Sequence, residues 1–358
     1  MRRIILLWCL LFTGMVLPAR SLKVGLFVSK PTRSIQFSSG KSPCHFYHKG
    51  SKVFDLPGGS TVFLEEFGGT IRLMQDGATR GLFSDLTIRP VIKSSAFSIR
   101  PGDKSEDFLP FNGSLTVKSK QGGLQLVNEV GMEEYVSAVV ESEIGLTSHP
   151  EMLKVQAILI RTYALANQHR HQAQGFSLCD GVHCQAYYGQ SRFNPSVQKA
   201  VSATKGQVVI DSEGKLVLSV YHSNCGGKTA YAGDAWSKDI PVLQPVIDSF
   251  CIASTHALWE KRMTSREWGR TLMRLGISDT SSIREQLTGL TDRVGFIGDG
   301  DTLIPVKLLR KELDLRSSFF SIEMEGDTVI LEGRGYGHGV GLCQEGAIAM
   351  AQQGFKAK

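Results

Sequence analysis

The residue best suited to acid–base chemistry is Glu143, which ends an apolar segment containing Val139 and Val140. An almost unbroken apolar stretch follows at Gln156–Leu165. Apolar surroundings raise the pKa of a carboxyl group, so that it keeps its proton near neutral pH and can act as a general acid. A lone glutamate is nevertheless more often a solvated acid on a helix surface. The residues alone therefore leave both interpretations of Glu143 open.

A second group has the spacing of metal ligands and contains His171, Cys179, His183 and Cys184. Two thiolates and two imidazoles suit a closed, tetrahedral zinc site. Such a site is structural, because it leaves no open position for a reacting molecule. His169 is an alternative to His171 as the first ligand. A Cys179–Cys184 disulfide, with both histidines incidental, is the competing interpretation.

Two later segments combine histidine with glycine. The first is His222–Gly227, and the second is Gly333–Gly341, which has glycine at every second position and includes His338. On an extended chain, alternating glycines clear one face of side chains, so that another backbone or a sugar ring can approach closely. The first segment is not a phosphate-binding loop, because His222 stands where that motif requires glycine.

Together these segments resemble the SpoIID/LytB family of cell-wall proteins. Glu143 matches the family's catalytic glutamate, with Ile144-Gly145 where members typically carry Met-Pro. The segment from His222 to Thr229 matches a motif that lines the substrate cleft in this family. The family's Gly-His-Gly-Val-Gly pattern is matched around His338, and Cys343 occupies a position where serine is usual.

The resemblance implies a lytic transglycosylase that cuts the β-1,4 bond after N-acetylmuramic acid in peptidoglycan glycan strands, including strands free of stem peptides. Glu143 would be the general acid and base, and no cofactor would take part in the chemistry. A non-catalytic wall-binding protein that modulates an N-acetylmuramoyl-L-alanine amidase is the alternative. The residues expected to contact substrate are His222, Ser223, Gly226, Gly227, Tyr188, His338 and Gln344.

The elements that must position these residues begin with a β-rich lobe over residues 22–128. Short strands separated by glycine turns are expected there, at Leu22–Val28, Thr61–Phe67, Thr70–Met74 and Leu115–Lys118. Helical character begins near Met132. Ser148 and Glu151 have the spacing of a capping box, which predicts a buried helix over roughly residues 150–171.

The rest of the chain completes an α+β fold, in which the resemblance implies a SpoIID-like core over residues 129–358. Strand-like alternation appears at 206–221, and polar residues at 276–302 indicate an insertion or a flexible surface segment. Three further elements are predicted: a helix at Arg266–Leu275, a hairpin joining Ser321–Glu325 to Thr328–Glu332, and a helix from Gln344 to Gln353 that stops at Gly354.

The N-terminus has the features of a signal peptide over residues 1–21, in which Arg2 and Arg3 precede a short apolar run. We therefore expect an exported protein of the periplasm or cell wall, without a membrane span in the mature chain. Removal of this segment deletes three arginines and no acid, so the formal charge of +6 falls by three. That balance is too small for a nucleic-acid-binding surface. Six of the seven cysteines remain, an even number that permits disulfides.

Overall fold

The structure is a computed structural model that describes residues 21–102, 107–120, 122–144, 148–189, 194–236, 238–300 and 302–357. The chain forms two compact units, and the division falls within its first α-helix. The first unit contains the residues up to Tyr135 together with Ala173–Cys179, and the second contains Val136–Gln172 and the residues from Asp180 onward. Except for Ser21, the predicted signal peptide lies outside the described residues, as does Gly145.

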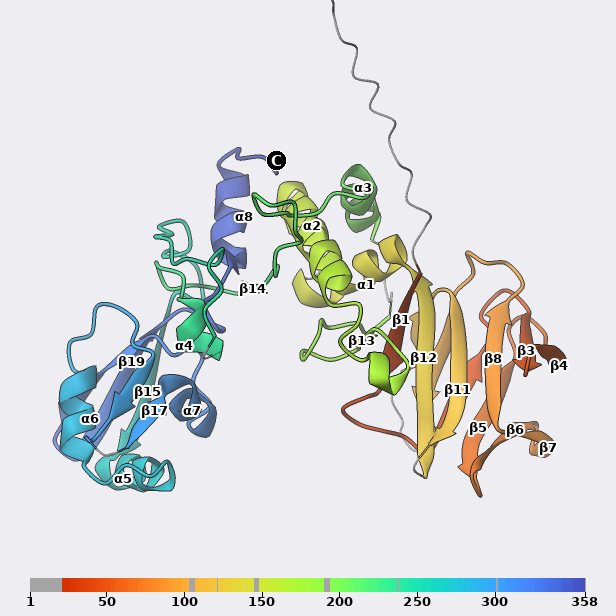
Figure 1. The fold of residues 1–358 in the computed structure, drawn as a ribbon, viewed down its shortest axis with the longest axis horizontal. Helices are drawn as coiled ribbons and strands as arrows, with labels where there is room; N and C mark the ends of the chain where they lie inside the picture. The colour runs from red at the N-terminus through yellow and green to blue at the C-terminus, as the bar shows by residue number, and fades with distance from the viewer. Residues whose placement is uncertain are drawn as a thin grey trace, which may run out of the picture. The chain divides into compact units, whose positions relative to one another are not determined.

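The first unit is built from two β-sheets, whose strands are drawn in red to yellow in Figure 1 except for the green β13. Their strands alternate buried and exposed side chains, as expected of sheets with one face on a core. The larger sheet has the order β13 (Leu178–Cys179), β1 (Ser21–Leu26), β12 (Gly123–Gly131), β11 (Ser114–Lys120), β8 (Asp85–Pro90), β3 (Cys44–His48) and β4 (Ser51–Leu56). The smaller has the order β10 (Leu109–Phe111), β9 (Phe97–Pro101), β2 (Ser34–Ser38), β5 (Thr61–Phe67), β6 (Thr70–Gln75) and β7 (Ala78–Phe83).

Aromatic side chains join the two sheets into a sandwich. Phe37 of β2 stacks on Phe97 of β9 with ring centroids 5.2 Å apart, and it meets Phe46 of β3 edge-on at 5.7 Å. All three rings are fully buried. Because β3 belongs to the larger sheet, these contacts show that the two sheets face each other across one core. The predicted all-β lobe is thus confirmed for the described residues.

The longest helix described in the second unit, α2 (Pro150–Ala166), packs against α3 (Pro195–Ala203) and α8 (Gln344–Gln352). The helix α1 (Met132–Ile144) begins where it was predicted. Two predictions about α2 were wrong. Its N-cap is His149, whose ring accepts a hydrogen bond from the Glu151 amide, so Ser148 does not form a capping box. The helix also stops near Asn167, before residue 171, because the Asn167 side chain hydrogen-bonds the Tyr163 carbonyl.

A three-stranded antiparallel sheet forms a further part of the second unit, with helices packed around it (Figure 1). The predicted hairpin is confirmed as β18 (Phe320–Glu325) and β19 (Thr328–Arg334), and β15 (Leu258–Thr264) pairs with β19. The predicted helix is confirmed as α5 (Ser265–Arg274). The sheet shares its core with α5, α6 (Thr280–Leu287), α7 (Val306–Glu312) and the hairpin β16 (Phe296–Gly298) and β17 (Leu303–Pro305).

Residues 276–302 were predicted to be an insertion or a flexible surface segment. The second alternative is wrong for the described residues, and the first stays a prediction. Ile283 and Leu287 of α6 and Ile297 of β16 are almost fully buried in the core of this sheet. The sequence of α6 is mostly polar and resembles that of a surface loop. Its few apolar residues lie on one face of the helix. Its neighbours therefore decide its structure, because a short amphipathic helix is stable only when its apolar face is covered.

The remaining short elements lie in the segments that carry the histidine–glycine motifs. The strands β14 (Tyr221–His222) and β20 (Leu342–Cys343) pair in parallel, and α4 (Ala232–Trp236) follows β14. The expected strand over 206–221 is wrong except for β14 and an isolated bridge between Ile210 and Leu216. A 3-10 turn, η1 (Gln172–Gln174), and the two-residue strand β13 complete the described elements. Among these residues, no helix has both the length and the apolar character that crossing a bilayer requires.

Candidate active site

A cavity of about 670 Å³ in the second unit brings Glu143 and His338 to one place, although 194 residues separate them in the sequence. Among the described residues that line it, Glu143 is the only acid, and Arg170 and Lys238 supply positive charge. Trp236 of α4 adds an aromatic ring to the same lining. Motifs that lie far apart along the chain thus contribute to one open cavity, in which the described lining residues supply a single carboxyl group.

Glu143 is the next-to-last residue of α1, and two groups hold its carboxyl in place. The Ala186 amide donates to Oε1 at 2.9 Å, and the Tyr221 hydroxyl forms a second hydrogen bond with the carboxyl. Burial raises the pKa of Glu143 above the ordinary value of 4.5, and the two hydrogen bonds oppose that shift without cancelling it. The surroundings of Glu143 are therefore those of a carboxylic acid that keeps its proton at higher pH than an ordinary glutamate does.

Tyr221, in β14, contacts both sides of the cavity. Its hydroxyl hydrogen-bonds Glu143 and Gln185, while its carbonyl accepts a hydrogen bond from the ring of His338. Burial, followed by the charge of Glu143, raises the pKa of Tyr221 well above 10, so the phenol stays protonated as a donor. Sequence reasoning missed both Tyr221 and Gln185. The available signal was their position, since each lies beside a residue of a recognised motif.

His338 is held in one orientation by contacts on both ring edges. The Val340 amide donates to Nδ1 at 3.1 Å, and the ring lies 5.1 Å from that of Trp236 and 5.6 Å from that of His222. Burial lowers the pKa of His338 to about 4. The imidazole is thus neutral at physiological pH and faces the cavity as a polar, uncharged group.

The other residues expected to contact substrate lie outside the described lining of this cavity. His222 is 4% exposed, its Nδ1 lies 3.1 Å from the Val340 carbonyl oxygen, and burial lowers its pKa to about 3. Gln344 begins α8 and donates to Gln156 of α2 at 3.4 Å. Tyr188 is half exposed, and Ser223 accepts the Glu345 amide through its carbonyl. Their substrate contacts stay predictions.

Gly333 lies in β19, but from Gly335 to Gly341 the glycine signature does not adopt the extended backbone from which a cleared face was inferred. Gly337 and Gly341 have φ of +108° and +74°, in the region that favours glycine. A Cβ on Gly337 would lie 2.9 Å from the Cβ of His222, and one on Gly341 would lie 2.3 Å from the Val220 carbonyl oxygen. Because these glycines have no side chains, the segment around β14 can pack directly against them. Of the two expectations, close approach of another backbone is what the structure shows.

Gly226 and Gly227 serve the same packing. Both have positive φ, +73° and +100°. A Cβ on Gly226 would meet Arg334 at 2.7 Å, at the end of β19. These glycines therefore allow the loop after β14 to turn tightly against the glycine signature. Any contact they make with a glycan stays a prediction.

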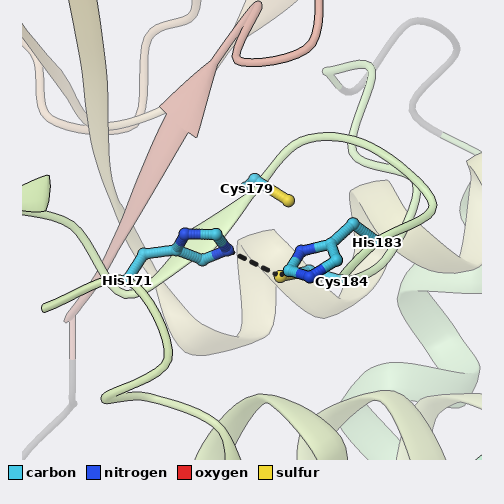
Figure 2. A group of neighbouring side chains, drawn as sticks. All are labelled: His171, Cys179, His183 and Cys184. Atoms are coloured by element: carbon cyan, nitrogen blue, oxygen red, sulfur yellow. Dashed lines mark hydrogen bonds between the residues drawn. The ribbon is translucent and has the colours of Figure 1, made fainter.

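The four proposed metal ligands come together, as Figure 2 shows, and two of them, His183 and Cys184, also line the cavity. One ligand atom from each of His171, Cys179, His183 and Cys184 lies within 4.8 Å of all the others. Cys184 Sγ is 3.4 Å from His171 Nε2 and 3.7 Å from His183 Nδ1. In this structure no bond joins Cys179 to Cys184, and the choice between zinc and a disulfide at these residues stays a prediction. His169, the alternative first ligand, is not part of the group.

Comparison with known proteins agrees with the resemblance seen in the motifs. Residues 120–210, which contain Glu143 and all four proposed metal ligands, match the family model described as SpoIID, stage II sporulation protein. Stage II sporulation protein D of Bacillus subtilis is 28% identical over 281 residues, which cover 73% of this chain and 80% of that protein.

Two further relatives match over smaller parts of their own length. An uncharacterized protein of Brachyspira hyodysenteriae is 29% identical over 68% of this chain and 65% of its own length. The protein called amidase enhancer in Bacillus subtilis is 24% identical over 61% of this chain but only 38% of its own length. The chain thus spans about two thirds of the first of these relatives and well under half of the second.

Proposed function

We propose that this chain, which belongs to the SpoIID family, is an exported lytic transglycosylase that cleaves the bond between N-acetylmuramic acid and N-acetylglucosamine in peptidoglycan glycan strands. The observation that carries the proposal is Glu143, the single acid among the described residues that line the cavity, half-buried and with a raised pKa. Hydrolases that cleave glycosides usually place two carboxyl groups across the bond. One carboxyl suits a reaction in which the substrate supplies its own nucleophile.

The reaction follows from the two protonation states of Glu143. The neutral carboxyl donates its proton to the glycosidic oxygen as that bond breaks, which releases N-acetylglucosamine with a free 4-hydroxyl. The resulting carboxylate then accepts the proton of the muramoyl 6-hydroxyl as that oxygen bonds to the anomeric carbon. The products are a 1,6-anhydromuramoyl end and a regenerated acid, so neither water nor a second carboxylate is consumed.

The other lining residues suit the binding of a charged sugar. Arg170 and Lys238 can pair with the carboxylate of a muramoyl lactyl group or of a stem peptide. Trp236 offers an apolar ring face against which a sugar can stack. His338, neutral and fixed by its two hydrogen bonds, presents an uncharged ring to the sugar and does not compete with Glu143 as an acid.

A structural zinc ion at His171, Cys179, His183 and Cys184 forms the second part of the proposal. The two nitrogens and two sulfurs within 4.8 Å are the donor set of closed zinc sites. The ion would fix the segment that ends at Ala186, whose amide binds Glu143. If His183 bound zinc through Nδ1, its Nε2 would carry the ring proton. Arg170, which lies 3.2 Å from Nε2 and can only donate, would then turn away from that nitrogen.

A modulator of a cell-wall amidase is the second candidate function, favoured by the relative called amidase enhancer. Such a protein needs to bind the wall but needs no acid with a raised pKa in a cavity. The half-buried Glu143 with its raised pKa therefore favours the enzyme.

The decisive experiment is mass spectrometry of purified glycan strands, with and without stem peptides, after incubation with the mature protein. The expected result is new 1,6-anhydromuramoyl ends that do not appear with the Glu143→Gln variant. Reducing muramoyl ends would instead reveal a hydrolase. Intact strands that co-sediment with the protein and raise the activity of an added amidase would establish the second function.

A further inference from the structure

A second cluster of metal-binding side chains lies in the second unit, apart from the four residues described above. It comprises Cys225, Asp248, Cys251 and Cys343, and one ligand atom from each lies within 4.8 Å of all the others. The three cysteines are almost fully excluded from solvent, with exposures of 0%, 0% and 6%. They come from three separate segments, so their convergence is a property of the fold rather than of local spacing.

Within the cluster sulfur both donates and accepts: the Cys225 thiol donates to Asp248, and Cys343 Sγ accepts from backbone amides. Cys225 Sγ lies 3.4 Å from Cys251 Sγ and 3.4 Å from an Asp248 carboxylate oxygen. The amides of Cys225 and Gly346 both point at Cys343 Sγ, each at 3.4 Å. Backbone amides aimed at sulfur stabilise thiolates, the form in which cysteine binds metals.

We propose that these four residues form a second structural metal site, which takes zinc through three thiolates and the Asp248 carboxylate. Zinc accepts sulfur and oxygen ligands in one tetrahedral shell. Zinc–sulfur bonds of about 2.3 Å place tetrahedral sulfurs about 3.8 Å apart, close to the separation of Cys225 and Cys251. The ligand set of the first site contains two histidines and two cysteines, so the two sites differ in donor chemistry.

A disulfide explains less of this arrangement. A bond between Cys225 and Cys251 would require their sulfurs to close to about 2.05 Å. It would also leave Cys343, with its two amide donors, and the Asp248 carboxylate facing a neutral disulfide without a cation. A metal ion gives each of the four side chains a partner.

The position of the cluster indicates what the ion would do. Cys225 lies in the loop after β14, and Cys343 ends β20 and caps the N-terminus of α8. The same loop is already tied to α8 by Asn224, whose side chain donates to a Glu345 carboxylate oxygen at 2.7 Å. Zinc would therefore hold β14, β20 and α8 in register, and with them Tyr221, which contacts both Glu143 and His338.

The test is the zinc content of the full mature protein, measured by native mass spectrometry and elemental analysis, with matched single-site variants. Wild type is expected to hold two zinc ions, and Cys184→Ser, which removes a ligand of the first site, to hold one. Cys343→Ser keeps an N-cap oxygen for α8 and should also lose one ion. Asp248→Asn, nearly identical in shape, should bind the second ion more weakly. Cys44→Ser, in the β-sandwich, should retain both.

Cobalt substitution identifies the donor set without reference to activity. Cys184→Ser leaves the second site intact, so cobalt(II) should bind there through three thiolates and give a tetrahedral spectrum. Cys343→Ser leaves the first site, which has two thiolates, so its sulfur-to-metal charge-transfer band should be weaker. One ion that survives in Cys184→Ser but not in Cys343→Ser supports this site even if the first holds none. Wild-type protein whose only zinc disappears in Cys184→Ser overturns the proposal, as does a Cys225–Cys251 disulfide in unreduced peptide maps.

Discussion

The two sides of the cavity are governed by the same physical effect with opposite consequences. On one side, burial raises the pKa of Glu143 and favours the protonated carboxyl. On the other, burial lowers the pKa of His338 to about 4 and that of His222 to about 3, which favours the unprotonated rings. Removal from water disfavours whichever form is charged. Both sides are therefore driven toward neutrality, but only the Glu143 side keeps a proton that it can donate.

This difference assigns separate tasks to the two sides. A neutral imidazole with a pKa near 4 is a poor acid at pH 7, whereas a carboxyl with a raised pKa is a good one. We therefore expect chemistry to depend on Glu143 and the geometry of the cavity to depend on the histidine side. Tyr221 joins them, through its hydroxyl to Glu143 and through its carbonyl to His338.

The largest effect is expected from Glu143→Gln, which removes the acid while preserving its shape. The amide oxygen can still accept from the Ala186 amide, so the fold should persist. Turnover should fall by about 10²–10⁴-fold, the usual contribution of a general acid, as measured by the rate of formation of anhydromuramoyl ends.

Glu141→Gln is the matched control for this change. Glu141 lies on the same helix and accepts the Asn194 amide at 2.8 Å, but it does not line the cavity. Its replacement should leave turnover nearly unchanged. Equal losses in the two variants would mean that α1 as a whole, rather than the Glu143 proton, supports activity.

On the histidine side, Gly337→Val should mainly cost stability. Its φ of +108° is strained for valine, by about 1–3 kcal/mol, and the new Cβ would press on His222, which adds about 1–3 kcal/mol. Gly354→Val separates the two causes, because its φ is +94° but no atom lies within 4 Å of its Cβ position. Urea unfolding should show the greater loss for Gly337→Val. Equal losses would remove the packing role given to this glycine.

The contrast between the two sides also shows what the sequence could predict. Where one strand pairs with its neighbour in sequence, as in β5 or the β18–β19 hairpin, alternation and turn residues located the element closely. The order of the motifs also selected Glu143 and His338, which the structure brings to one cavity. Their catalytic and binding roles remain predictions.

What failed depends on contacts between distant segments. The alternation at 206–221 predicted a strand, but outside β14 and one bridge it finds no pairing partner. Glycines at every second position indicated an extended chain, whereas their positive φ fits them against β14. The part played by Tyr221 likewise follows from the pairing of β14 with β20, which no local pattern encodes.

A smaller effect is expected from His338→Asn. The asparagine oxygen can accept the Val340 amide in place of Nδ1, so unfolding free energy should change by about 1 kcal/mol or less. Loss of the ring from the cavity should lower turnover about tenfold, which corresponds to about 1.4 kcal/mol. Unchanged turnover together with a clear loss of stability would make His338 a structural residue only.

The smallest effect, and the most informative about how the two sides are joined, is expected from Tyr221→Phe. The acid must be protonated to donate, so activity should fall as pH rises through the pKa of Glu143, which burial places above 4.5. The Tyr221 hydroxyl stabilises the carboxylate and lowers that pKa, so its removal raises the pKa further and should move the alkaline limb of the rate profile to higher pH. Turnover at the optimum should change only a few-fold, because the Ala186 amide still positions the carboxyl. A purely structural loss would lower the rate at every pH without moving the limb. An acidic limb that moves to higher pH, in place of the alkaline limb, would show that Glu143 acts first as a base, and the order of its two proton transfers would have to be reversed.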